Sequence, residues 1–297
     1  MLTALAPSSR YYQKRGREPQ NLTDRTRKII LQIQRWAAGR DLIFVADSAY
    51  AVLELLAWCR KLGVTLIAPL RLDAALFAPA PQPRRGQMGR PRLKGSRLPA
   101  LAARLKEPKA RWRRLQVRWH GQGWRRVELL TGAAIWYHSG KAPVPIRWVL
   151  VRDPLGRFDT RALLSTDPSM SARQILELFT RRWQVEVTFE EARAHLGVET
   201  QRQWNAKAIR RAPPILFGLF SIVTLMAHRL HQKDRSLPRP RAAAWYDKKH
   251  ISFSDALACV RDHLWKKTFC WSSKTLDRQK LQRQWLAHFS DLLCYAQ

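Results

Sequence analysis

The chain has 297 residues, and its 54 Lys and Arg against 22 Asp and Glu give a formal net charge of +32 at pH 7. Apolar residues make up 46% of the chain, which is enough to build a core and excludes a disordered basic tail. So large an excess of positive charge predicts a polyphosphate partner, and the alternative is a basic surface without a specific role.

The cysteines and the apolar segments limit the possible sites and compartments. None of the cysteines forms a Cys-x-x-Cys pair, so we expect reduced structural thiols rather than zinc ligands or disulfides. The first residues are too short and too uncharged for a signal peptide. Residues 213–227 are apolar but shorter than the ~20 residues of a bilayer span, which predicts a buried helix. We therefore expect a cytoplasmic protein without a membrane partner.

The chain is expected to open with a short strand over residues 2–6, followed by a basic loop over residues 10–21. Thr23 is a candidate N-cap for an amphipathic helix that reaches about residue 38. The apolar side chains that define one face of this helix are Ile29, Ile30, Ile33 and Trp36.

A strand–helix–strand unit follows. The apolar run over residues 42–46 predicts a strand buried on both faces, and residues 51–62 and 64–70 predict a helix and a second buried strand. Short connections of this kind indicate a parallel pair of strands. Asp47 ends the first strand, at the edge of the sheet where sites form in open α/β folds, and the alternative is that Asp47 caps the helix that begins at Ala51.

The character of the sequence changes after residue 71. Residues 79–97 are rich in Pro, Gly, Arg and Lys and predict a cationic loop, in which we take Arg90, Arg92 and Lys94 as DNA contacts; the alternative is a flexible surface linker. Segments that alternate or run apolar between Gly and Pro breaks then predict antiparallel strands over residues 115–119, 126–130, 134–138 and 146–151.

Helical patterns occupy the rest of the chain, over residues 171–195, 209–231, 252–265 and 274–294. The first of these helices carries an unusual face at three- and four-residue spacing, made of Phe179, Arg182, Glu186, Phe189 and Arg193. A solvated row of ion pairs is one interpretation. The apolar neighbours of Glu186 favour another, in which this acid points into the structure and binds a divalent metal next to phosphate.

This face resembles the Y-(2)-R-(3)-E-(6)-K signature of bacterial insertion-sequence transposases with an RNase H-like catalytic core. Phe179 stands at the Tyr position, Arg182 at the Arg position, Glu186 at the Glu position and Arg193 at the Lys position. Phe in place of Tyr loses a hydroxyl, and Arg in place of Lys keeps the charge with a different geometry. Residues 45–50, 197–204 and 252–257 look similar to segments of the same group.

The resemblance implies an α/β fold, in which an RNase H-like core is interrupted by a mainly antiparallel β insertion and followed by a helical C-terminal region. The corresponding boundaries are residues 1–72 and 166–232 for the two parts of the core, 73–165 for the insertion and 233–297 for the helical end.

The same resemblance implies the chemistry, which is metal-dependent cleavage and transfer of DNA strands at transposon ends. Asp47 would be the second and Glu186 the third acid of a D-D-E triad that binds Mg²⁺ or Mn²⁺. Arg182 and Arg193 would grip phosphates of the transposon end with Phe179 beside them, and an ion pair of either arginine with Glu186 is the alternative. The implied partners are terminal inverted repeats, target DNA and a second copy in a synaptic complex, which predicts association with the nucleoid.

The first acid of the triad has no evident counterpart. The acids that precede Asp47 are Glu18, Asp24 and Asp41, and none of them ends an apolar strand. We therefore expect that the first acid and an N-terminal DNA-end-binding region are missing and that the chain alone is inactive. The alternatives are a non-catalytic DNA-binding remnant, an inhibitor of transposition, or an RNA-associated basic protein, for which no RNA-binding signature is present.

Overall fold

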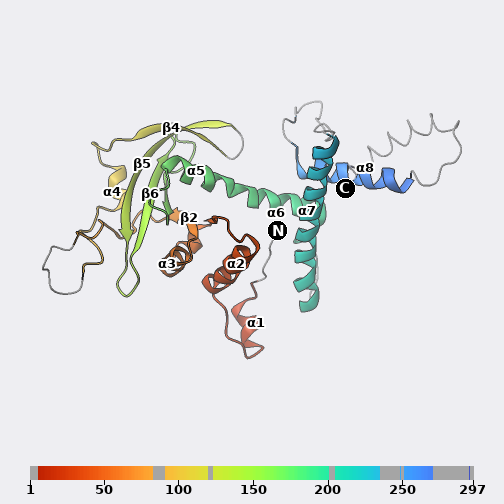
Figure 1. Ribbon diagram of the computed structural model, residues 1–297, viewed down its shortest axis with the longest axis horizontal. Coiled ribbons are helices and arrows are strands. Elements are labelled where there is room, and N and C mark those ends of the chain that lie inside the picture. Colours follow the sequence, from red (N-terminus) through yellow and green to blue (C-terminus); the bar gives the residue numbers. More distant parts are fainter. Residues whose placement is uncertain are drawn as a thin grey trace. The chain divides into compact units, whose positions relative to one another are not determined.

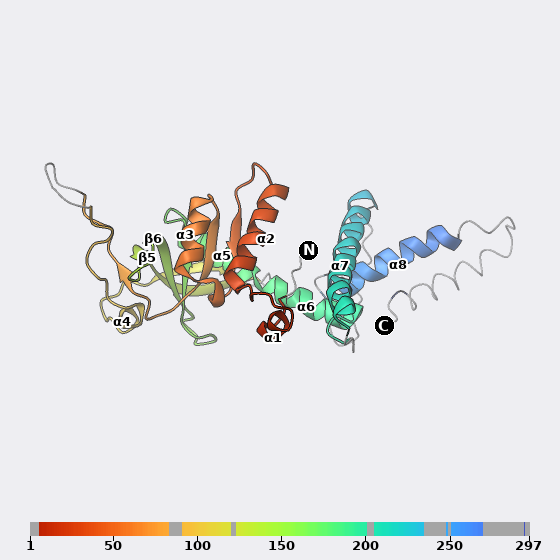
Figure 2. The same ribbon diagram turned by 90° about the horizontal axis from the view of Figure 1, so that it is seen from below.

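The computed structural model shown in Figures 1 and 2 describes residues 6–82, 91–119, 123–200, 205–234, 248, 251–269 and 294. The chain forms two compact units. Pro7–Gln184 make up the first, called here the sheet unit, and Val185–Gln297 together with Met1–Ala6 make up the second, called here the helical unit. The expected strand over residues 2–6 and the expected helix over residues 274–294 lie outside the described residues, apart from Ala6 and Cys294.

The sheet unit contains a sheet of seven strands with helices on both faces. Its elements are α1 (Ser9–Gln13), α2 (Leu22–Trp36), β1 (Ile43–Val45), η1 (Ser48–Tyr50), α3 (Leu53–Lys61), β2 (Thr65–Leu70), β3 (Leu76–Phe77), α4 (Leu101–Leu105), β4 (Arg113–Arg118), β5 (Trp124–Trp136), β6 (Val144–Arg152), β7 (Arg161–Ser165) and α5 (Ala172–Arg181).

The strand order is β1-β2-β7-β6-β5-β3, and β4 pairs with β5 beside this path. The β1–β2 pair is parallel, with Ile43 opposite Thr65, which confirms the strand–helix–strand unit, and the other strand pairs are antiparallel. The strands of the expected insertion therefore continue the same sheet as β1 and β2, joined to them by the β2–β7 pair. The sequence did not predict β7, the strand that makes this connection.

The expectation that the first strand is buried on both faces is wrong. β1 forms the edge of the sheet, and Ile43 is 44% exposed. β2 has a neighbour on each side, and its Leu66, Ile67 and Ala68 are fully buried. The apolar runs thus identified both strands, but they did not show which strand lies at the edge of the sheet and which lies inside it.

Two strands expected on either side of Gly132 are one continuous strand, β5. Gly132 lies opposite Trp148 of β6, and a Cβ at Gly132 would come 2.7 Å from Trp148 Cζ2. This glycine therefore marks a close approach of an indole ring to the backbone rather than a break in the strand.

Two apolar cores cover the faces of the sheet. One core packs α2 and α3 against the sheet through Ile30, Leu55 and Leu56, over Ile146 and Leu150 of β6. The other packs α5 against the opposite face. Its fully or nearly fully buried members include Ile67, Val127, Val149, Leu163, Ile175 and Leu176.

Helix ends follow ordinary capping chemistry. The N-cap of α2 is Asn21 rather than Thr23, because Asn21 Oδ1 accepts the Asp24 backbone N–H at 2.9 Å and Thr23 already lies within the helix. α5 begins with a capping box in which Ser171 and Gln174 bond reciprocally. The helix expected over residues 171–195 is interrupted at Arg182, so that α6 (Trp183–Leu196) is a separate element.

The helical unit contains most of α6, then α7 (Ala206–Asp234) and α8 (Phe253–Phe269). The helix expected over residues 209–231 is confirmed, but the expectation that its apolar stretch at residues 213–227 is buried holds for one side of the helix only. α7 has 29 residues and includes Pro213 and Pro214, and its Phe217, Val223 and Ala227 are buried. Apolar side chains at helical spacing on the rest of its surface are exposed, namely Ile215, Leu219, Ile222 and Leu225.

α7 is long and apolar enough to cross a membrane by length and composition, and a single helix of this kind is weak evidence for a span. Its buried side packs on the neighbouring helices through aromatic contacts. Phe217 meets Phe189 of α6 edge-on at 5.0 Å between ring centroids, and Phe220 stacks on Phe253 of α8 at 4.1 Å. These contacts hold α7 to α6 and to α8.

Candidate functional site

Asp47 lies two residues after the end of β1, at the carboxyl end of the parallel pair, as expected. Its side chain is exposed, and its Oδ1 accepts the Ser48 backbone N–H at 2.9 Å, which caps the single turn η1. Asp47 therefore caps a helix, as the alternative expected, but the helix is the short turn η1. The longer helix α3 begins at Leu53 without a side-chain cap. The second carboxylate oxygen of Asp47 has no hydrogen bond within the described residues, so it can accept a ligand.

Glu186 lies in the first turn of α6, and its side chain is exposed. The expectation that it points into the structure is wrong. Its apolar neighbours are themselves exposed, with Trp183 at 47% and Val185 at 50%. Apolar residues next to an acid therefore say little about its burial when only one residue of the helix, Ala192, is buried.

Phe179 and Arg182 form one contact where α5 ends. The Arg182 guanidinium lies 5.6 Å from the centroid of the Phe179 ring, and Phe179 packs against the core beneath α5. A ring held by a core restricts the conformations of the cation above it. The contact brings the Arg182 cation close to the Phe179 ring, and a role of either residue in binding DNA stays a prediction.

Arg193 pairs with Glu199 in the helical unit. Its Nε lies 3.0 Å from Glu199 Oε2, and both side chains are more than half exposed. Glu199 has a positive φ of 67° in the turn that follows α6. An exposed pair of this kind contributes about 0–1 kcal/mol, so it leaves Arg193 able to exchange Glu199 for a phosphate.

The cationic loop is described in part, and Arg90 lies outside the described residues. Arg92 is exposed. Lys94 is half-buried, with its Nζ 3.5 Å from the ring centroid of Phe77 and 4.1 Å from that of Tyr137. These contacts tie Lys94 to the sheet, so the linker alternative does not describe this end of the loop.

The described residues contain no group of three or more His, Cys, Asp or Glu placed to hold a metal ion. Asp47 belongs to the sheet unit and Glu186 to the helical unit. Each supplies a carboxylate, the ligand type that Mg²⁺ and Mn²⁺ prefer. Of the acids that precede Asp47, Asp24 pairs with Arg27 in α2, and neither Glu18 nor Asp41 follows a strand.

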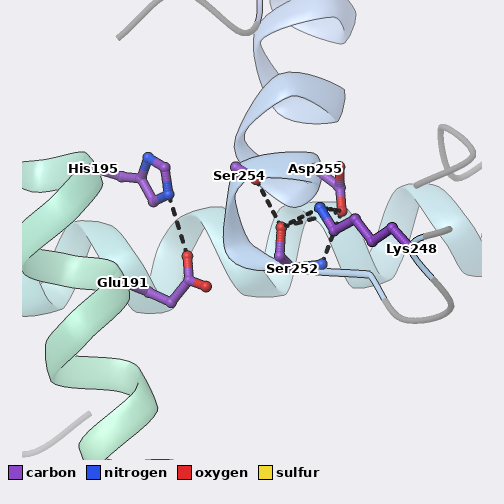
Figure 3. A network of polar contacts seen from close by, with 6 residues as sticks. All are labelled: Glu191, His195, Lys248, Ser252, Ser254 and Asp255. Atoms are coloured by element: carbon purple, nitrogen blue, oxygen red, sulfur yellow. Dashed lines mark hydrogen bonds and ion pairs between the residues drawn. The ribbon is translucent and has the colours of Figure 1, made fainter. Parts of the chain in front are cut away.

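The helical unit also holds a polar network that the sequence did not predict, shown in Figure 3. Asp255 is fully buried, and its Oδ2 accepts from Lys248 Nζ at 2.6 Å and from the Ser252 backbone N–H at 2.9 Å. Burial opposes ionisation of Asp255, but the hydrogen bonds from Lys248 and Ser252 outweigh it and lower the pKa of this carboxyl. The Ser-x-x-Asp spacing before α8 is the capping signal that could have revealed it.

Cys59 is the most clearly inert of the described thiols. It is free and fully buried in α3, and burial raises its pKa to about 11. Cys259 is half-buried in α8, and Cys294 is buried.

Comparison with known proteins places this arrangement in a family. A family model described as a transposase DDE domain matches residues 19–207, a range that includes Asp47, Glu186 and both arginines of the signature. No curated protein matches the chain. The mixed α/β architecture agrees with the RNase H-like fold that this family implies, and proteins of the family are generally soluble, act on DNA and use divalent metal ions. Because the match covers more than half of the chain, this protein belongs to the family of DDE-domain transposases.

Proposed function

We propose that this chain acts in the metal-dependent cleavage and transfer of DNA strands at the ends of an insertion sequence, with Asp47 and Glu186 as two of the metal ligands. The observation that carries the proposal is the transposase match, whose range spans both acids. The place of Asp47 at the carboxyl end of the parallel β1–β2 pair supports it.

The exposed carboxylates of Asp47 and Glu186 would hold Mg²⁺ or Mn²⁺. A bound ion of this kind polarises the scissile phosphate and lowers the pKa of the attacking water or 3′-hydroxyl. The described residues hold no group of three such ligands, so the proposal assigns two ligands to this chain and leaves the third unassigned.

Arg182, Arg193, Arg92 and Lys94, with Phe179, would contact the terminal repeats or the target DNA. Arg182 and Lys94 are supported by aromatic rings, which lowers the entropic cost of fixing these long side chains on phosphate. The proposed organisation keeps residues 1–72 and 166–232 as core, 73–165 as insertion and 233–297 as the helical end. Assembly as a homodimer on two transposon ends and association with the nucleoid belong to the same proposal.

Nicking of a plasmid that carries the ends of the element, measured with and without Mg²⁺ or Mn²⁺, tests the function. Asp47→Asn and Glu186→Gln should abolish metal-dependent nicking while DNA binding persists. Asn at position 47 keeps the oxygen that caps η1, so this change removes charge without removing the cap. Asp41→Asn and Glu190→Gln are matched controls at exposed acids nearby and should nick normally.

A wild-type chain that binds DNA but nicks no plasmid under these conditions overturns catalysis by this chain and agrees with the expectation from the sequence that the chain alone is inactive. It would favour the alternative of a non-catalytic DNA-binding remnant or an inhibitor of transposition.

A further inference from the structure

One face of the β4–β5 hairpin carries a ladder of basic side chains. Cross-strand partners in an antiparallel pair point to the same side of a sheet, and residues two apart on one strand share that side. The register therefore places three rungs on one face, Arg118 opposite Trp124, Gln116 opposite Arg126, and Arg114 opposite Glu128, which in turn faces Arg152 of β6. We call these seven residues the arginine face.

The same side of the sheet changes character at the next rung. Leu130 and Leu150 follow Glu128 and Arg152 toward the core that α2 and α3 cover. In Figure 1, α2 and α3 lie below the sheet and β4 lies at its top, away from both helices. No helix covers the arginine face within the described residues, and the side chain of Arg114 is 84% exposed while Trp124 is 65% exposed.

The third rung pairs its two cations with one carboxylate. Glu128 lies between two guanidinium groups, with Arg114 Nε 3.1 Å from Oε1 and Arg152 Nε 2.9 Å from Oε2. The Arg152 guanidinium also lies 4.0 Å from the centroid of the Trp112 ring. A carboxylate shared by two arginines leaves a net positive charge and restrains both side chains.

The other two rungs carry cations that are not neutralised. Neither Arg118 nor Arg126 has an acidic partner among the described residues, and both side chains are exposed. Neighbouring strands lie ~4.8 Å apart and residues two apart on a strand lie ~7 Å apart. Four arginines at these separations, beside one exposed indole, form a compact and strongly positive surface.

We propose that the arginine face binds the sugar–phosphate backbone of duplex DNA, as a contact surface separate from Asp47, Glu186 and the cationic loop. Arg118 and Arg126 neutralise phosphates, Arg114 and Arg152 add charge from the third rung, and Trp124 covers apolar sugar surface between the cations. Arginine matches this role because its planar donors pair with two oxygens of one phosphate. The inference rests on the proposed function for its DNA substrate.

The test is the salt dependence of binding to a fluorescently labelled DNA duplex of mixed sequence. Each phosphate contact contributes about −0.9 to the slope of log K against log salt concentration. Arg118→Ala combined with Arg126→Ala should therefore reduce that slope by about 2 and weaken binding roughly ten-fold or more. The charge-matched control, Arg35→Ala combined with Arg40→Ala, removes two exposed arginines in and just after α2, away from β4 (Figure 1), and should change the slope little.

Two further variants keep the test independent of folding. Arg118→Lys combined with Arg126→Lys preserves the charge and should preserve most of the slope. Gln116→Arg adds a cation at the second rung and should steepen the slope by about 1. Equal losses in the Ala double variant and its control, or tighter binding to duplex RNA than to duplex DNA, overturn the inference.

The two proposals fail separately. A chain that nicks its plasmid but binds DNA without dependence on Arg118 and Arg126 retains the proposed function and refutes the arginine face. A chain that nicks nothing but loses DNA binding with these arginines supports the arginine face and refutes the catalytic proposal.

Discussion

The sheet unit and the helical unit bury their side chains in different ways. In the sheet unit, aliphatic residues from strands and helices are fully buried on both faces of one sheet, among them Leu55, Ile67 and Leu150. In the described part of the helical unit, buried residues form two small clusters around Phe217 and Phe253. A sheet with two covered faces gives each apolar side chain several partners, whereas three helices leave much apolar surface in contact with water.

Two paired carboxylates, one from each unit, lie in different surroundings. Glu128 of the sheet unit lies between two arginines that are themselves partly or largely exposed, at 39% and 84%. Asp255 of the helical unit is fully buried, and its partner Lys248 is 19% exposed. The first pair of contacts is placed to meet an external anion, and the second is placed to hold α8 in position.

The largest expected effect compares the loss of a side chain buried in the sheet unit with the loss of an exposed apolar side chain in the helical unit. Leu150→Ala removes a fully buried side chain from the central strand β6 and should lower the free energy of unfolding by about 2–5 kcal/mol, measured by denaturant titration. Leu225→Ala on the exposed side of α7 should change it by less than about 0.5 kcal/mol. An equal loss in both variants would mean that this side of α7 is covered in solution.

The second effect concerns the buried acid of the helical unit. Asp255→Asn keeps the shape of the side chain but removes the charge that Lys248 and Ser252 contact. It should lower the free energy of unfolding by about 1.5–3 kcal/mol, measured by thermal unfolding. Asp159→Asn, at an exposed acid of the sheet unit, serves as the control and should leave the unfolding temperature unchanged. A loss below about 0.5 kcal/mol for Asp255→Asn would show that this network does not hold α8 in position.

A third prediction gives this network a pH dependence. The pKa of Asp255 is lowered in the folded chain, so its contribution to stability is complete above the ordinary Asp pKa of about 3.9 and is lost as the pH falls through the lowered value. Lys248→Met removes a hydrogen bond that lowers this pKa and leaves burial, which raises it. Acid unfolding of this variant should therefore begin at a higher pH than in the wild type. Identical acid transitions would contradict the assignment.

The comparison also explains what the sequence could predict. The run at residues 42–46 and the position of Asp47 were predictable, because an apolar strand followed by an acid is a local pattern. The exposure of Glu186 and of Leu225 was not, because the helical period shows which residues share a face and not whether a neighbour covers that face. The continuity of β5 through Gly132 depends on Trp148, a partner from another strand.

The arginine face illustrates the same limit. Alternation along β4 and β5 was visible, but only the register of the strands shows that Arg114, Gln116 and Arg118 share a side with Trp124 and Arg126. Sequence separation along the chain gives no such register without the turn geometry. The sequence therefore predicted cations in the loop at residues 79–97 and on the helix face of Arg182 and Arg193, and none on the sheet.

The smallest expected effect tests the difference between the two carboxylates. Hydrogen bonds from Arg114 and Arg152 hold the pKa of Glu128 below its usual value, so the side chain is ionised at neutral pH and competes with phosphate for both arginines. Glu128→Gln removes that competition and should steepen the salt dependence of duplex binding by about 1 and tighten binding several-fold. Glu107→Gln, at an acid outside the arginine face, should tighten binding less. Weaker binding after Glu128→Gln would show that Glu128 acts like Asp255. It would then order Arg114 and Arg152 for DNA binding rather than compete with phosphate for them.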